Sequence, residues 1–412
     1  MRHLLMPDLN NRADLKLSPD HALTDEQQQL VDRIEAFCLK HEDDGPGAVF
    51  VVQGAAGTGK SIVMNSAFAR LRQRAAAKDG NALSGQSMVF LVNHPEMIKL
   101  YRRIAEGVPC LRKRDYERPT SFINQAHKTG QKTDIVFIDE AHLLLSRRDA
   151  YNRFLQDNQL EEILRLSRVV VMVFDPCQVL KFKSFWDESA LHRILGDRQV
   201  VVQHLTTQFR MQAHDDVIGW IDAFCHQRLL PLPAPQPFDF QIFEDAQALY
   251  EAIRAHEAQL GLCRMVATYD YPYVLDGQDH FITEGRFHLR WDRSLPQERL
   301  PWAERPDTID EVGSVYTVQG FDLNYIGLIL GPSVDYDSET DKIILHTACY
   351  QDSAAFAGQS AVENPAAAKE QIMLNALNVL MTRPVRGLYL YASRPALHQR
   401  LKTLWQQRSA LL

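Results

Sequence analysis

The feature that most constrains this chain is a glycine-rich segment between a short apolar run and a helical stretch. It reads Gly54-Ala-Ala-Gly-Thr-Gly-Lys-Ser61 and follows the β-branched run Val49 to Val52. Glycines let successive backbone N–H groups turn toward one anion, and the start of the following helix adds its positive end. A glycine-rich turn without a ligand is the alternative. The pattern favours a phosphate-binding loop made of Gly54, Ala55, Ala56, Gly57, Thr58, Gly59, Lys60 and Ser61.

Two carboxylates follow a second apolar run. Ile135 to Ile138 leads directly into Asp139 and Glu140. Ligands of parallel α/β sheets bind at the carboxyl ends of the strands, so a buried strand would deliver both acids to the phosphate loop. We expect Lys60 to reach the β- and γ-phosphates, Ser61 and Asp139 to hold Mg²⁺, and Glu140 to orient and deprotonate the attacking water.

The spacing of apolar runs predicts an α/β fold with two lobes. Runs at 49–52, 88–92, 135–138 and 169–174 alternate with helical stretches, and a second series lies at 264–267, 325–330 and 388–391. Alternation of this kind predicts parallel sheets covered on both faces. We expect an N-terminal extension (1–22), a first lobe (23–200) and a second lobe (201–412) with insertions near 276–310 and 333–370.

Composition excludes a membrane protein and leaves the partner open. The chain has 412 residues, 45% of them hydrophobic and 24% charged, and no apolar run approaches a membrane span. It begins without a secretory signal, so we expect a cytoplasmic location. The net charge of -7 argues against a general polyanion binder. Basic residues gather locally at 99–118 and after Glu370, as a solvated helix face or as a phosphate-facing surface.

The order of the motifs resembles that of superfamily 1 helicases. After the loop and the Asp-Glu-Ala-His segment come Asp175-x-x-Gln178 and Gln208-Phe-Arg210, then Thr317-Val-Gln319-Gly320 and Thr382-Arg383-Pro384. The resemblance implies two RecA-like parallel-sheet lobes with ATP in the cleft between them. It also implies that Gln178 senses the γ-phosphate, that Arg210 and the finger Arg383 act on the nucleotide, that Gln319 and Gly320 border it, and that Thr317 contacts nucleic acid.

A glutamine upstream of the loop is expected to read adenine. Leu23-Thr-Asp-Glu-Gln27 resembles the adenine-reading motif of these helicases, and a glutamine amide can bond the N6 and N7 edge of adenine. Gln28 and Gln29 adjoin Gln27, so the register is ambiguous. Thr24 is equally typical of a helix N-cap.

A closer resemblance extends over about Leu23 to Ala396. The stretches at 263–273, 320–331 and 386–391 resemble the helicase-like domain of long (group III) Schlafen proteins and their stand-alone bacterial relatives. This implies nucleic-acid contacts at Asn93, His94, Thr120 and Ser121. We expect an ATP-dependent translocase or helicase on single-stranded DNA or RNA; the alternative is a nucleotide-gated switch that senses nucleic acid or a protein partner without unwinding. Five aromatic residues are candidates either for stacking on bases or for the core: Tyr269, Tyr271, Tyr273, Trp291 and Trp302.

Overall fold

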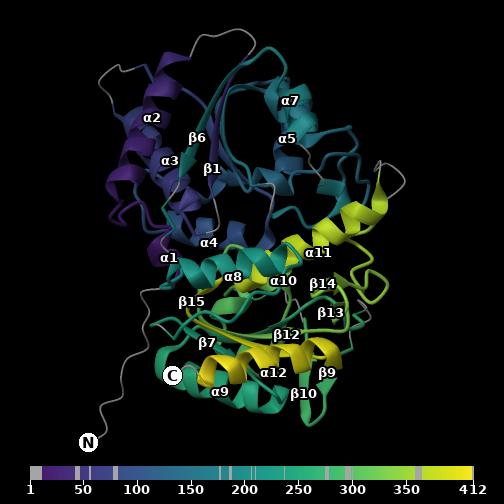
Figure 1. The fold of residues 1–412 in the computed structure, drawn as a ribbon. Coiled ribbons are helices and arrows are strands. Elements are labelled where there is room, and N and C mark those ends of the chain that lie inside the picture. Colours follow the sequence, from purple (N-terminus) through teal and green to yellow (C-terminus); the bar gives the residue numbers. More distant parts are fainter. Residues whose placement is uncertain are drawn as a thin grey trace, which may run out of the picture. The chain divides into compact units, whose positions relative to one another are not determined.

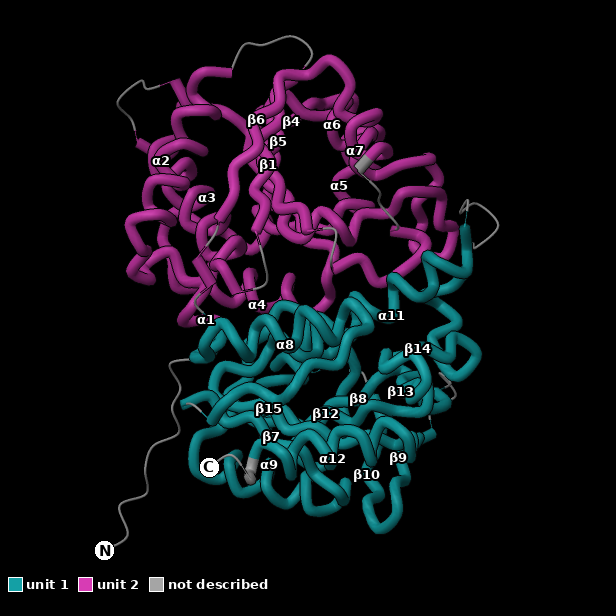
Figure 2. The backbone as a smooth tube through the Cα atoms, in the orientation of Figure 1, with its two compact units in different colours: residues 1–12, 209–412 teal, residues 13–208 magenta. Residues whose placement is uncertain are grey.

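A computed structural model of the chain divides into two compact units (Figure 2). The N-terminal lobe comprises residues 13–208, and the C-terminal lobe comprises residues 209–412, with which residues 1–12 are grouped. The structure describes residues 12–41, 47–54, 57–77, 82–175, 178–184, 188–205, 207–208, 210–235, 237–273, 278–292, 298, 300–357 and 364–410.

The N-terminal lobe is built on a six-stranded sheet. The strand order is β3-β2-β4-β5-β1-β6, and every pairing is parallel. Its strands are β1 (Ala48–Gly54), β2 (Met88–Val92), β3 (Tyr116–Glu117), β4 (Thr133–Asp139), β5 (Ser167–Val173) and β6 (Gln199–Leu205). Its helices are α1 (Ala13–Lys16), α2 (Asp25–Lys40), α3 (Lys60–Ala76), α4 (Pro95–Ala105), α5 (Pro119–Thr129), α6 (Gln159–Arg165) and α7 (Glu188–Leu195).

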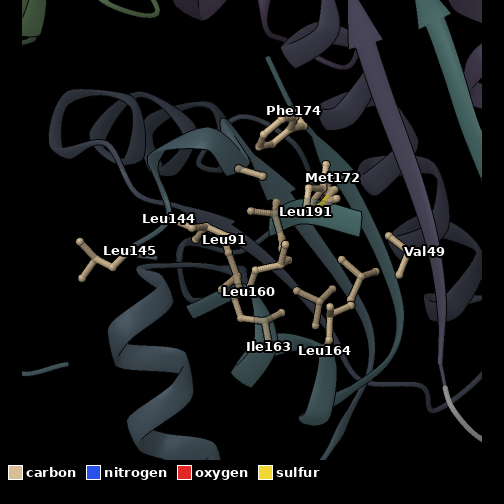
Figure 3. Close-up of a cluster of buried hydrophobic side chains, with 14 of the residues drawn as sticks. Val49, Leu91, Leu144, Leu145, Leu160, Ile163, Leu164, Met172, Phe174 and Leu191 are labelled. Carbon is tan, nitrogen blue, oxygen red and sulfur yellow. The ribbon is translucent and has the colours of Figure 1, made fainter. Parts of the chain in front are cut away.

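Apolar side chains cover both faces of this sheet, as a parallel sheet requires. On one face, strand residues such as Val49, Leu91 and Met172 pack against Leu160, Ile163 and Leu164 of α6 and Leu191 of α7 (Figure 3). On the other face an aromatic group joins the helices to the strands, with Phe68 of α3 edge-on to the rings of Phe90 and Phe137. Figure 1 shows α2 and α3 on the opposite side of the strands from α5 and α7.

The C-terminal lobe is built on a seven-stranded sheet of order β7-β15-β12-β8-β11-β10-β9, in which only the β9–β10 pairing is antiparallel. Its strands are β7 (Asp239–Ile242), β8 (Cys263–Ala267), β9 (His280–Glu284), β10 (Phe287–Trp291), β11 (Glu311–Gly313), β12 (Leu323–Leu330) and β15 (Pro384–Ala392); β13 (Val334–Asp337) and β14 (Lys342–Leu345) form a separate pair. Its helices are α8 (Asp215–Cys225), α9 (Ala246–Leu260), α10 (Val315–Val318), α11 (Pro365–Met381) and α12 (Pro395–Ala410).

One helix carries much of the core of the C-terminal lobe. Leu249, Tyr250 and Ile253 of α9 pack with Met265 of β8 and Trp291 of β10 in one buried cluster. Gly327 of β12 lies where a Cβ atom would come within 2.8 Å of Ile253, so the close approach of α9 to the sheet requires glycine there. Figure 1 shows α9 and α12 on the other side of the strands from α8 and α11.

Two stretches differ from the sequence expectation. The expected lobe boundary at residues 200 and 201 falls inside β6, which pairs along its length with β1 and so belongs to the first sheet. Within the expected insertion at 276–310, β9 and β10 extend the second sheet through the β10–β11 pairing. The other expected insertion, 333–370, contains the β13–β14 pair and the first turns of α11.

Among the helices that the structure describes, none combines the length and the apolar character needed to cross a membrane.

Candidate nucleotide and nucleic-acid sites

The glycine-rich segment connects β1 to α3. Gly57 and Gly59 adopt φ angles of 87° and 85°, a left-handed conformation that glycine allows at little cost. Gly54 is needed for a different reason, because a Cβ atom there would lie 2.8 Å from the Leu205 carbonyl oxygen of β6. The segment leads into the N-terminus of α3, a 17-residue helix, and a helix N-terminus favours the binding of an anion. Ala55 and Ala56 lie outside the described residues.

Lys60 is buried, and its polar contacts include two within this lobe. Its Nζ donates to the Gly54 carbonyl oxygen at 2.5 Å and lies 3.2 Å from Asp175 Oδ2. Burial is the largest single influence on Asp175 and favours the neutral acid, but the charges of Lys60 and His142 and the hydrogen bond from Gln178 together hold the pKa of Asp175 below its ordinary value. The ammonium group thus already lies opposite an anionic oxygen, the kind of partner that a nucleotide phosphate would supply.

Asp139, at the end of β4, is enclosed by two hydroxyl donors. Ser61 Oγ donates to Oδ1 at 3.1 Å, and the buried Tyr101 hydroxyl donates to Oδ2 at 2.6 Å. Burial raises the pKa of Asp139 to about 7, with a further contribution from the neighbouring Glu140. A cation next to this carboxylate would favour its charged form.

Glu140 and Gln178 lie near the same strand ends. Glu140 has a φ of 54°, and its Oε2 lies 3.1 Å from Nε2 of the fully buried His142. Gln178 donates from Nε2 to Asp175 Oδ2 at 2.6 Å, and Asp175 follows β5. Because β4, β5 and β1 are adjacent parallel strands, these polar groups share one edge of the sheet with the loop.

The donor set fits magnesium. Ser61 and Asp139 present a hydroxyl and a carboxylate, the hard oxygen ligands that Mg²⁺ prefers. Mg²⁺ is usually held by one or two protein oxygens together with substrate phosphates rather than by a cage of side chains. The described part of the chain has no group of three or more histidine, cysteine, aspartate or glutamate side chains able to hold a metal.

Gln27 is the glutamine that lies beside the phosphate loop. Its Nε2 donates to the Thr58 carbonyl oxygen at 3.3 Å, and its backbone and side chain form a reciprocal cap with Thr24 at the start of α2. Gln28 instead donates to Asp32, and Gln29 is exposed. The two interpretations of this motif are therefore compatible, since the capping box fixes the amide against the loop.

In the C-terminal lobe, the arginines expected to act on the nucleotide lie near the starts of β12 and β15. Arg210 pairs with Asp322 and donates to the Thr382 carbonyl oxygen at 3.4 Å, next to the buried Arg383. Gln319 ends α10 and is buried, with its Nε2 unbonded within the described residues, and Gly320 has a φ of 89°. Thr317 is also buried, and its hydroxyl donates to the Ser314 carbonyl oxygen at 2.9 Å.

The residues expected to contact nucleic acid in the N-terminal lobe differ in exposure. Asn93 donates to the Leu143 carbonyl oxygen at 2.6 Å, and His94 is the buried N-cap of α4. Thr120 accepts a hydrogen bond from Gln159 at 2.9 Å, whereas Ser121 beside it is exposed. Ser121 is thus the member of this set that is open to solvent.

Acids accompany much of the basic stretch at 99–118. Lys99 pairs with Glu96 at 3.0 Å, and Lys113 pairs with Glu106. Near the C-terminus, Lys402 pairs with Glu244 at 2.7 Å and Arg400 lies 3.2 Å from Asp341. Pairing of this kind is typical of a solvated surface.

Three residues of the site, Tyr101, His142 and Asp175, have no role that the sequence alone indicates. Tyr101 lies on α4 outside any motif, and nothing in the sequence marks it as a partner of Asp139. His142 belongs to the Asp-Glu-Ala-His segment, in which only the two acids have an expected role. A signal existed for Asp175, because a carboxylate directly after an apolar strand is expected at the ligand-binding edge.

A sequence model of the Schlafen group 3 DNA/RNA helicase domain matches residues 47–394. The chain belongs to this family. An uncharacterized protein of Saccharomyces cerevisiae, YPL245W, is 40% identical over 425 residues, which cover 96% of this chain and 93% of the yeast protein. Among solved structures, the Pif1 helicase from Candida albicans matches with 12% identity and a TM-score of 0.35, covering 95% of this chain and all of that one. AMPPCP-bound DnaA from Aquifex aeolicus matches with 11% identity and a TM-score of 0.26, over 46% of this Schlafen-family chain and 49% of DnaA.

Family and topology together confirm the expected fold class of RecA-like parallel-sheet lobes and the expected resemblance to the helicase-like domain of Schlafen proteins.

Proposed function

We propose that this Schlafen-family protein is a cytoplasmic, ATP-dependent translocase or helicase on single-stranded nucleic acid, hydrolysing ATP to ADP and phosphate with Mg²⁺. The observation that carries the proposal is the meeting of Lys60, Ser61, Asp139 and Gln178 beside one phosphate loop. A glycine-rich turn with no ligand would not need a buried lysine and a buried carboxylate at the same strand edge.

In this proposal each residue has a separate task. Lys60 exchanges the carboxylate of Asp175 for the β- and γ-phosphates, and Gln178 turns its amide to the γ-phosphate. Glu140 accepts a proton from the attacking water while the water oxygen bonds to the γ-phosphorus. The bond between the γ-phosphorus and the oxygen that bridges it to the β-phosphate breaks, and ADP leaves. Ser61 and Asp139 would hold Mg²⁺, which neutralises charge on the phosphate oxygens. Arg210 and Arg383 are assigned to the same phosphates by family resemblance, with Arg383 as the finger.

The proposal is tested by steady-state hydrolysis of ATP with and without single-stranded DNA and RNA. We expect Glu140→Gln to bind ATP with little change while turnover falls at least about 100-fold, since a positioned base contributes about 10² to 10⁴. Lys60→Ala should weaken ATP binding and abolish turnover. Retained hydrolysis in both variants would contradict the assigned site. Hydrolysis that neither polymer stimulates would favour the nucleotide-gated switch, and a strand-displacement assay separates unwinding from translocation alone.

A further inference from the structure

The segment from Asp139 to α6 contains a turn that presents an aromatic ring to solvent. Tyr151 is 87% exposed, more than any other large hydrophobic side chain that the structure describes. By contrast, Trp291, Trp302 and Tyr271, three of the rings that the sequence suggested for stacking, are buried. The ring of Tyr151 is thus available to a partner outside the chain.

The support of this turn, residues 149–154, is firmly held. Asp149 and Phe154 are buried and exchange two backbone hydrogen bonds of 2.9 and 3.0 Å. The Asp149 carboxylate accepts from the Tyr151 backbone N–H at 3.2 Å and from Asn152 Nδ2 at 2.8 Å, and it lies 3.1 Å from Lys183 Nζ. Tyr151 is therefore displayed by a backbone that is already ordered, which lowers the entropy cost of stacking.

Arginines lie close to Tyr151 in the sequence. Arg148 and Arg153 are exposed, and Arg147 is half-buried. Arg148 lies 3.7 Å from the Asp157 carboxylate, but both side chains are open to water, where such a pair is weak and easily exchanged. An exposed tyrosine with an exposed arginine three residues before it and another two residues after it provides both kinds of group that bind a single strand, an aromatic face for the base and a guanidinium for the phosphate.

The turn is hydrogen-bonded to α5, the helix that carries Thr120 and Ser121, two of the residues that the family resemblance assigns to nucleic acid. Asn124 of α5 donates to the Arg153 carbonyl oxygen at 3.2 Å, and Gln159, just after the turn, donates to Thr120. Just before the turn, Leu143 accepts from Asn93. The exposed ring therefore belongs to a turn bonded to the helix at which the family resemblance implies a nucleic-acid contact.

We propose that the turn 149–154 is a contact for single-stranded nucleic acid, in which Tyr151 stacks on an unpaired base and Arg148 and Arg153 bind the adjoining phosphates. The inference rests on the proposed function, since it names how that function's polymer is held. It also places this contact 11 residues after Glu140, on the segment that joins the catalytic strand β4 to α6. Single-stranded nucleic acid bound there would contact the same segment of chain that carries Glu140.

The test is fluorescence anisotropy of the full chain with fluorescein-labelled oligothymidylate and oligouridylate. Loss of one aromatic stack weakens binding about 5- to 100-fold, so Tyr151→Ala should show a loss in this range while Tyr151→Phe keeps the wild-type affinity. The matched control is Phe281→Ala, which removes an exposed ring from the C-terminal lobe and should bind as the wild type does. Arg153→Gln should lower the slope of log affinity against log salt by about 0.7.

Each outcome decides the inference. Equal affinities for Tyr151→Ala and the wild type, or an equal loss in Phe281→Ala, would overturn it while leaving the proposed function intact. Wild-type protein that hydrolyses ATP but binds neither oligonucleotide would overturn both the contact and the nucleic-acid part of the proposed function, and would leave a protein partner as the occupant of the turn. The thermal midpoint of Tyr151→Ala should match the wild type, because the removed ring is 87% exposed.

Discussion

Tyr101 and Ser61 each hold one oxygen of the Asp139 carboxylate. Removing such an orienting donor typically costs 10- to 100-fold in metal affinity. Tyr101→Phe should therefore raise the Mg²⁺ concentration that half-saturates ATP hydrolysis by about tenfold, with a smaller change in maximal turnover. The measurement is a magnesium titration of steady-state hydrolysis at saturating ATP.

A neighbouring tyrosine supplies the control for this prediction. Tyr116 is stacked on Tyr101 with ring centroids 5.4 Å apart, and its hydroxyl donates to Asn65 instead of to the site. Tyr116→Phe removes the same atom from the same buried cluster, with a comparable stability cost of about 1 kcal/mol. An equal magnesium shift in both variants would mean that Tyr101 acts through packing.

At the scale of one element, the start of α2 is fixed to the phosphate loop through Gln27. Gln27→Ala removes half of the capping box and the amide beside Thr58. We expect a stability loss of about 1 kcal/mol and a reduction of about tenfold in the ratio of kcat/KM for ATP over GTP. Gln28→Ala, one residue along the same turn, should leave the ratio unchanged; an equal change there would assign adenine reading elsewhere.

The elements show where sequence reasoning succeeds. The buried strands β1, β2, β4, β5, β8, β12 and β15 were predicted because each is a continuous apolar run, and α2 and α3 because caps and glycines mark their ends. The edge strands β6 and β9 were missed, since each mixes apolar with polar residues and only one residue of each is buried. Tyr101 and Tyr151 were missed for a related reason, because contacts and exposure depend on tertiary packing.

Across the whole molecule, one buried acid makes stability depend on pH. Burial raises the pKa of Asp292 to about 7, against the lowering effect of hydrogen bonds from Ser314 and Tyr269. Between about pH 4 and 7 the folded chain keeps a proton that the unfolded chain releases, so this group's contribution to stability falls as pH rises through that window. Asp292→Asn should therefore raise the free energy of unfolding at about pH 8 by a few kcal/mol at most, and with it the thermal midpoint. Near pH 4 it should change the midpoint little.

Thermal unfolding at both pH values measures this effect. The exposed Asp222 on α8 provides a control, because Asp222→Asn removes an equal charge without burial and should shift neither midpoint. A gain for Asp292→Asn that is the same at both pH values would rule out proton linkage as its cause.

The N-terminal lobe, residues 13–208, is one uninterrupted run of chain, and this has a consequence for biosynthesis. Its central strand β1 pairs on one side with β6, which is the last strand of the lobe to be made. Until Leu205 has been synthesised, β1 has an unpaired edge that other strands can join. Translation of the roughly 200 residues that follow takes about 10 to 40 s. The sheet of the N-terminal lobe can therefore be completed while the chain is still on the ribosome, before the C-terminal lobe exists.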